Sequence, residues 1–129
     1  MTASTHRRIV VRPDDAAFVP YDRYGEPVPG MYWVNISLDR DTGCGMFLLR
    51  MDPGSRSLPH EHVDYEEFHV LKGALVDDDG SVFGPGAIVS FRPGTCHSST
   101  APEGCTLLVS LRCGNRLLSA EEAGKLPEA

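Results

Sequence analysis

Two histidines that flank a single residue, His60 and His62, are the first sign of chemistry in this sequence. In an extended chain, side chains two positions apart point to the same face, so both imidazoles are presented together. A carboxylate arriving from the next strand would complete three corners of a divalent-metal site. Glu66 and Glu67 both compete for that corner.

The alternation of side chains along a strand separates these two glutamates. If Phe68 and Val70 face the interior, Glu66 shares their face because even numbers of residues separate the three. Glu67 then lies on the outer face. On this parity, Glu66 is the predicted ligand.

A third histidine, His97, follows a Pro93-Gly94 turn downstream. Such a tight turn re-aims the chain, and we expect it to set His97 at the mouth of a barrel. Cys96 precedes His97 directly, so it should point the opposite way and is not a favoured ligand.

These residues also have ordinary structural interpretations. An isolated His-x-His with a nearby Glu is most often a solvated polar strand face, and a lone His97 is most simply a turn residue. His6 lies in a frayed terminus and His69 on the outer strand face, so neither is assigned to the site. Surrounding acidic residues are expected to be mainly exposed charge around turns: Glu61, Asp64, Glu66, Glu67, Asp77, Asp78 and Asp79.

The elements that must position these side chains are short strands. The chain of 129 residues holds 13 Gly and 10 Pro, which suits strands joined by tight turns better than long helices. Strand patterns recur about every 8–12 residues, which is typical of an antiparallel sandwich or barrel. They cover 9–11 (an edge strand), 31–36, 46–51, 65–71, 74–76, 81–83, 87–91 and 105–111.

The organisation predicted from this pattern is one all-β domain with a short C-terminal helix. Residues 1–30, with four prolines, read as an extended N-terminal arm; 31–118 form the barrel; 119–129 form a helical tail. Ser119 offers an N-cap for that helix, and Glu122 completes a capping box.

Composition and charge exclude several classes of function. The net charge is −6 and no basic run exceeds Arg7-Arg8, so a nucleic-acid-binding surface is not expected. No stretch approaches the ~18 apolar residues of a membrane span, and none has the apolar core of a signal peptide. The four cysteines contain no C-x-x-C pair, which predicts free thiols in a reducing cytoplasm, with Cys105 and Cys113 in the core.

Two longer sequence patterns that contain these histidines resemble the motifs of a known protein family. Gly54, His60-Glu61-His62, Glu66 and Gly73 resemble the first motif of the cupin superfamily at its spacing, and Gly86, Pro93-Gly94 and His97 resemble the second. The resemblance implies an antiparallel double-stranded β-helix, a jelly-roll barrel. By matched position it also implies metal ligation by His60, His62, Glu66 and His97. One departure is that Ala101 stands where the second motif often carries an Asn, which is not a ligand.

The amino-acid sequence of four segments is similar to that of the cupin domain of ChrR-type anti-sigma factors: residues 66–73, 78–80, 93–98 and 103–107. Those proteins add a helical N-terminal zinc domain that binds the sigma factor. The first thirty residues here show no helical period and no Cys cluster, so sigma binding does not carry over. Stand-alone cupins similar to this chain include iron dioxygenases that cleave diketones.

Two functions are compatible with this site. Imidazole and carboxylate ligands bind several divalent metals, so the ligands alone do not identify the metal. With Fe²⁺ it would serve a dioxygenase-type oxygenase acting on a small oxygen-rich molecule; with Zn²⁺ it would serve as a Lewis acid or in a non-catalytic sensor or binding module. Mn²⁺ and Ni²⁺ also suit these ligands. No separate catalytic acid or base is evident, since Tyr65 or His69 would serve only in another strand register.

The remaining expectations concern the cavity and partners. The predicted walls of the substrate pocket are Phe47, Met51, Phe68, Val70 and Phe91. Arg50 or Arg92 can meet an anionic group, but each is more simply a surface residue. The predicted partner is a small molecule, without nucleic acid or membrane, and the arm offers a means of forming a homodimer.

Overall fold

The structure is a computed structural model that describes residues 7–127, so His6 lies outside the described residues. Nearly all of its regular structure is β-strand, with one short 3₁₀ turn, η2 (Pro13–Asp15), and one short helix, α1 (Ala120–Ala123). The strands are β1 (Val19–Pro20), β2 (Met31–Asn35), β3 (Gly45–Met51), β4 (Ser55–Arg56), β5 (His60–His62), β6 (Glu66–Gly73), β7 (Leu75–Asp77), β8 (Val82–Phe83), β9 (Ile88–Phe91), β10 (Cys96–His97), β11 (Ser99–Ala101), β12 (Cys105–Leu111) and β13 (Asn115–Leu117).

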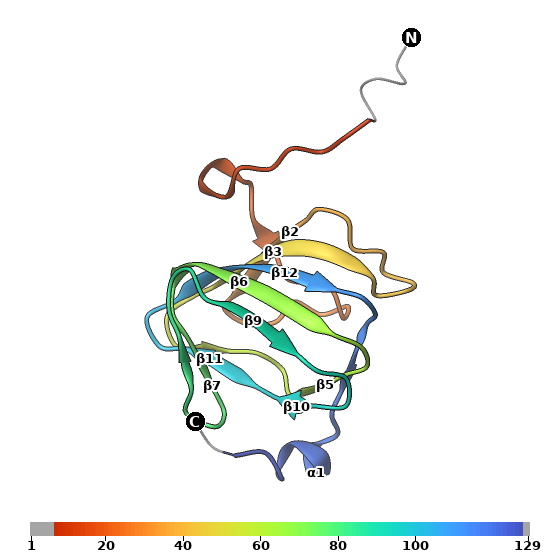
Figure 1. The fold of residues 1–129 in the computed structure, drawn as a ribbon, viewed down its shortest axis with the longest axis vertical. Coiled ribbons are helices and arrows are strands. Elements are labelled where there is room, and N and C mark those ends of the chain that lie inside the picture. Colours follow the sequence, from red (N-terminus) through yellow and green to blue (C-terminus); the bar gives the residue numbers. More distant parts are fainter. Residues whose placement is uncertain (1–6, 128–129) are drawn as a thin grey trace.

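These strands form three antiparallel sheets that enclose one core. The largest has the order β1-β2-β3-β12-β6-β9, and two smaller sheets, β10-β5-β13 and β4-β11-β7-β8, make up the opposite layer (Figure 1). Neighbouring strands such as β3 and β12 are far apart in the sequence, as closure of a jelly roll requires. The predicted all-β antiparallel jelly-roll fold with one short helix is confirmed.

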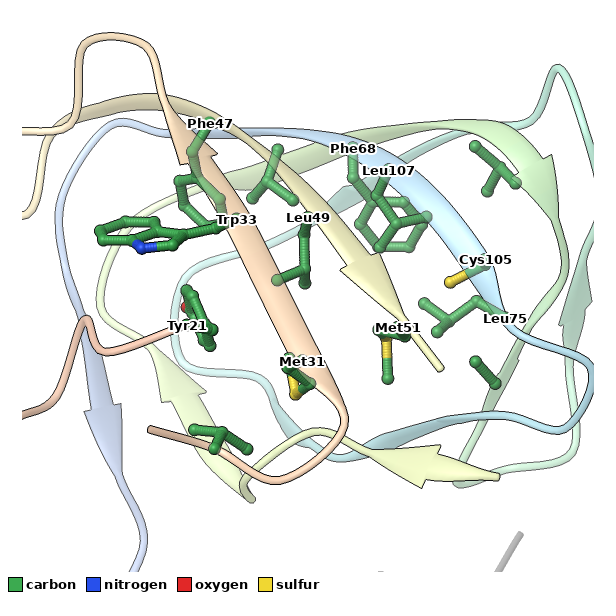
Figure 2. Packing of buried hydrophobic residues seen from close by; sticks show 14 of the residues in the cluster. Tyr21, Met31, Trp33, Phe47, Leu49, Met51, Phe68, Leu75, Cys105 and Leu107 are labelled. Carbon is green, nitrogen blue, oxygen red and sulfur yellow. The ribbon is translucent and has the colours of Figure 1, made fainter. Parts of the chain in front are cut away.

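The core lies between the layers because the large sheet alternates apolar and polar side chains. Along β12, every second residue from Cys105 to Leu111 is buried, and β6 alternates in the same way over Glu66–Val70. Figure 2 shows Trp33, Phe47 and Tyr21 packed at one end of this core and Met51 near the other. Period-two alternation of this kind is what a half-buried strand produces, so these segments could be predicted from sequence.

The N-terminal segment contributes to this core rather than only covering it. Strand β1 pairs with β2, and Tyr21 and Val28 are among the buried core residues. By contrast, the edge strand predicted at 9–11 is not formed, and Ile9 and Val10 are largely exposed. The division at residues 30 and 118 stays a prediction.

Gly73 ends β6 at a sharp bend, as its motif position suggests. Its φ is +70°, and a Cβ built there would lie 2.1 Å from the carbonyl oxygen of Gly104. A side chain at this position would meet both backbone strain and a collision with backbone, so only glycine fits.

The C-terminal helix begins with the predicted capping box: Ser119 accepts from the Glu122 N–H, and the Glu122 side chain accepts from the Ser119 N–H. The helix is shorter than the predicted tail and ends at Ala123. Arg116 on β13 connects this turn to the barrel by ion pairs to Glu122 and Glu61, both at 2.8 Å. Among residues 7–127, no helix is long and apolar enough to cross a membrane. All four cysteines are free thiols; Cys105 is buried and Cys113 partly exposed.

Candidate metal centre

Strand register brings three histidines together. His60 and His62 lie on β5 with the more exposed Glu61 between them, so both imidazoles enter the interior. β10 pairs antiparallel with β5 and sets His97 directly opposite His60. The Pro93-Gly94 turn precedes β10, Gly94 has a φ of +85°, and exposed Cys96 points away from the cluster. The local geometry therefore follows from one two-residue period and one turn.

Glu66 enters the cluster from the first residue of β6. It is buried on the same face as Phe68 and Val70, while Glu67 points outward and accepts a hydrogen bond from Ser90. Asn115 on β13 donates to the Glu66 Oε2 at 3.3 Å. The inward position of Glu66 and the outward position of Glu67 are those predicted from the alternation of side chains along the strand.

The four side chains form a compact buried group. One ligand atom from each of His60, His62, Glu66 and His97 lies within 4.8 Å of all the others. The Glu66 Oε2 is 2.7 Å from the His62 Nε2 and 3.5 Å from the His60 Nε2, and the Nε2 atoms of His60 and His97 are 3.1 Å apart. None of the four residues is more than 9% exposed.

Each imidazole is oriented by a partner on its far nitrogen. The Nδ1 of His60 donates to the Leu58 carbonyl at 2.7 Å, and that of His97 donates to Asp77 at 2.6 Å. The Nδ1 of His62 lies 2.8 Å from the Thr95 hydroxyl, which itself donates to a carbonyl and so must accept from the ring. All three hydrogens therefore sit on Nδ1, and three Nε2 lone pairs point inward, the arrangement of metal-binding histidines.

These converging lone pairs need a cation. The buried Nε2 of His62 makes no hydrogen bond within the described residues, because it carries no hydrogen in this tautomer and the nearby Glu66 carboxylate has none to donate. The Nε2 atoms of His60 and His97 face each other with no hydrogen between them in these tautomers. A divalent ion bound by three neutral imidazoles and one carboxylate would satisfy all of them and keep about one net positive charge. The residues present fit a metal ion.

The electrostatics of the cluster agree with this fit. Burial disfavours the charged form of Glu66, but the adjacent imidazoles of His60 and His62 outweigh burial and hold the pKa of its carboxyl well below the usual range. Burial lowers the pKa of His60, yet Glu66 reverses this and raises it. Glu66 is thus an anion in a site that requires positive charge.

Asp77 and Asp78 correct one sequence-based expectation. Both were expected to be exposed turn charges, but each is only 5% exposed. Burial raises the pKa of Asp77, and the hydrogen bond with His97 more than offsets this and lowers it. Asp77 also accepts from the Ser99 hydroxyl at 3.0 Å. The signal that could have found it is its two-residue spacing from Leu75, which places both on the inner face of β7.

A small cavity opens beside the cluster, with about 60 Å³ available to the centre of a water-sized molecule. His60, Glu66 and His97 form part of its wall. Most of the remaining wall is apolar and includes Phe47, Met51 and Phe68 from the predicted pocket. The other two predicted residues do not line this cavity: Val70 is fully buried in the core, and the Phe91 ring stacks on His62 at 4.8 Å.

The polar part of the cavity wall comes from residues that the sequence did not single out. Arg23 and Tyr24 belong to the N-terminal segment, and Asn115 belongs to β13. The arginines considered from sequence, Arg50 and Arg92, are exposed, and Arg50 lies over the rings of Phe18 and Tyr32. No local pattern marked Arg23, because its place in the cavity depends on how the arm closes over the barrel.

Comparison with known families decides the relationship. Residues 6–113 match the model of a family described as the ChrR Cupin-like domain. The chain belongs to the ChrR cupin-like family. This match covers both sequence motifs, and its end lies just beyond β12. No curated protein matches this ChrR cupin-like chain.

Solved structures share the fold of this ChrR cupin-like chain. A putative acetylacetone dioxygenase from Methylibium petroleiphilum matches with a TM-score of 0.75 and 16% identity over 95% of this chain and 87% of that chain. An acetylacetone dioxygenase from Acinetobacter johnsonii matches at 0.74 and 15% over 94% and 82%. The complex of SigE with the anti-sigma ChrR from Rhodobacter sphaeroides matches at 0.61 and 22% over 78% of this chain and 50% of that chain. At these identities the likeness is one of fold.

Proposed function

We propose that this chain is a divalent-metal-dependent oxygenase of the dioxygenase type that acts on a small oxygen-rich molecule. The observation that carries the proposal is that His60, Glu66 and His97 form one wall of a largely apolar cavity. A purely structural metal site would need no such space. The fold shared with two acetylacetone dioxygenases supports the same assignment.

The residues around the cavity have separable parts in this function. His60, His62, Glu66 and His97 would hold the ion, and Fe²⁺ in this position would supply activation of O₂ and of a chelating substrate. The carbonyl of Leu58, Asp77 and Thr95 keep the imidazoles in the binding tautomer. The largely apolar wall would favour burial of the carbon skeleton of a ligand, and the limited space beside the metal centre suits a small compound.

Anaerobic loading with Fe²⁺, followed by measurement of O₂ uptake with a panel of diketones and hydroxy-ketones, tests the proposal. We expect uptake with at least one compound in the wild-type protein and none in His60→Ala. His69→Ala is the matched control, because His69 alternates with the inward residues of β6 and contacts no member of the cluster. Absence of O₂ uptake with every compound, in protein shown to hold iron, would contradict the oxygenase assignment.

The alternative function is a non-catalytic zinc-binding sensor or small-molecule-binding module. The match to the ChrR–SigE complex favours it, since the matched chain there belongs to a regulatory assembly. Elemental analysis of protein purified without added metal separates the two functions. Zinc alone, together with no O₂ uptake after exchange to iron, would support the sensor and exclude the oxygenase.

A further inference from the structure

Arg23 brings a positive charge to a cavity wall that is otherwise mostly apolar. Its guanidinium lies over the rings of Tyr24 and Phe47, at 5.0 and 5.7 Å from their centroids. Its hydrogen bond to the Tyr21 hydroxyl is long, at 3.4 Å. Among residues 7–127 it forms no ion pair with a carboxylate, although four other Lys and Arg residues, Arg40, Lys72, Arg112 and Arg116, do.

This arginine stands where the cavity meets the surface. An outer pocket, lined in part by Arg40 and Asp41, shares Arg23, Tyr24 and Asn115 with the inner cavity. These three side chains therefore line both the outer pocket and the cavity beside the metal centre. The aromatic rings fix the guanidinium plane there without using its N–H donors.

Asn115 gives a second, independent indication that this wall receives a polar ligand. Its Nδ2 is occupied by Glu66, while its buried Oδ1 accepts no hydrogen bond within the described residues. A buried acceptor without a donor is unfavourable unless a water or a ligand supplies one. An anion offers only acceptors, so Asn115 marks this wall as polar, while the preference for an anion comes from Arg23.

The cavity wall offers Arg23 no counter-charge of its own. Among the described residues that line the cavity, Glu66 is the one carboxylate, and it pairs with His60 and His62 of the metal centre rather than with Arg23. One carboxylate on the ligand would supply the negative charge that this single guanidinium lacks.

We infer that Arg23 is a specificity-determining residue that binds the carboxylate of the substrate, so that the substrate is a small monoanionic oxo acid rather than a neutral diketone. This inference rests on the proposed function for the identity of the site, and it names the class of substrate. Arginine matches a carboxylate with two parallel N–H donors, so the recognition is directional as well as electrostatic. The keto oxygen of such an acid then faces the metal centre.

Calorimetric titration of the zinc-loaded protein tests this inference without relying on turnover. Acetoacetate and acetylacetone are the probes, because they have the same size and oxygen spacing and differ in carrying a carboxylate or an acetyl group. We expect wild-type protein to bind acetoacetate more tightly. Arg23→Gln should weaken acetoacetate binding by at least about tenfold and change acetylacetone binding by less than about threefold. Arg23→Lys should retain an intermediate preference for the acid.

Arg50→Gln is the matched control, because Arg50 is exposed, lies over the ring of Tyr32 and does not line the cavity. It should leave both affinities unchanged. Equal weakening of both ligands by Arg23→Gln, no weakening of either, or failure of wild-type protein to bind acetoacetate would each overturn the inference. If Arg23→Gln does not fold, the comparison of Arg23→Lys with wild type decides in the same way. A preference for the acid that depends on Arg23, in protein that shows no O₂ uptake, would contradict the proposed oxygenase and leave this anion site standing.

Discussion

The hydrogen bond between His97 and Asp77 shows at the scale of single residues how the metal centre is prepared. The carboxylate holds the hydrogen of His97 on Nδ1 and so directs the Nε2 lone pair toward His60. Ser99 holds the carboxylate in turn. Replacing a group in this position typically lowers metal affinity by about 10- to 100-fold.

Replacing Asp77 with Asn should therefore weaken metal binding. Asn keeps the size and one acceptor oxygen but removes the negative charge that stabilises the Nδ1–H tautomer. We expect zinc affinity, measured by competition with a chromogenic chelator, to fall by about 10- to 100-fold. Asp79→Asn, in the exposed part of the same turn, should leave affinity unchanged. An unaltered zinc affinity in Asp77→Asn would refute this role.

The residues that could be predicted from sequence are those whose geometry is local. His60, His62 and Glu66 follow from the two-residue period of neighbouring strands, and His97 follows from a turn of defined chemistry. Arg23 has no such signal, because it reaches the cavity only when a segment without periodic pattern folds over the barrel. Long-range closure of this kind depends on packing that a sequence pattern does not contain.

At the scale of elements, apolar alternation located strands better than β-propensity did. The segments 31–36, 46–51, 65–71 and 105–111 correspond to β2, β3, β6 and β12, the four central strands of the large sheet. Residues 9–11 have equal β-propensity, yet they pair with no strand among the described residues and stay irregular. A strand is stabilised by its partners and its buried face, so propensity alone misplaced this one.

The bend between β6 and β7 gives a direct test of element geometry. Gly73→Ala should lower the free energy of unfolding by about 2 kcal/mol or more, because the new Cβ would collide with the Gly104 carbonyl at a positive φ. Gly84→Ala is the control, since a Cβ there meets nothing within 4 Å, and should change stability by less than about 0.5 kcal/mol. Urea denaturation followed by the fluorescence of the single tryptophan, Trp33, measures both. Equal stabilities of the two variants would contradict the strain argument.

The connection between β13 and α1 should depend on pH in a defined direction. Hydrogen bonds from Arg116 lower the pKa of Glu122 to about 2. Because this folded-state pKa lies below the unfolded value of about 4.3, the contact stabilises the tail above that value and is lost as pH falls toward 2. A carboxyl NMR titration should place the Glu122 midpoint near 2 in wild type and higher in Arg116→Gln. The same low midpoint in Arg116→Gln would show that Arg116 is not the cause.

At the scale of the whole molecule, the N-terminal segment joins the fold to the site. Residues 7–18 lead away from the barrel in Figure 1, whereas β1, Tyr21 and Val28 lie within its layers. Tyr21 packs edge-to-face on Trp33 at 5.2 Å and also lines the cavity. Residues 19–28 thus both close the core and supply Arg23. A change that detaches this segment is therefore expected to impair barrel closure and substrate specificity together.

Two shortened proteins separate the outlying part of the arm from the part that closes the barrel. A protein that begins at residue 17 loses η2 and the exposed Lys72–Asp14 ion pair, and should retain its stability within about 1 kcal/mol and its zinc affinity unchanged. A protein that begins at residue 31 loses the buried Tyr21 and Val28 side chains, each worth about 1.5–3 kcal/mol, which is a large fraction of the stability of a small domain. Urea denaturation and zinc titration of both proteins measure the difference. If the protein beginning at residue 31 unfolds at the wild-type urea concentration, residues 19–30 are a dispensable cover, and the barrel closes without them.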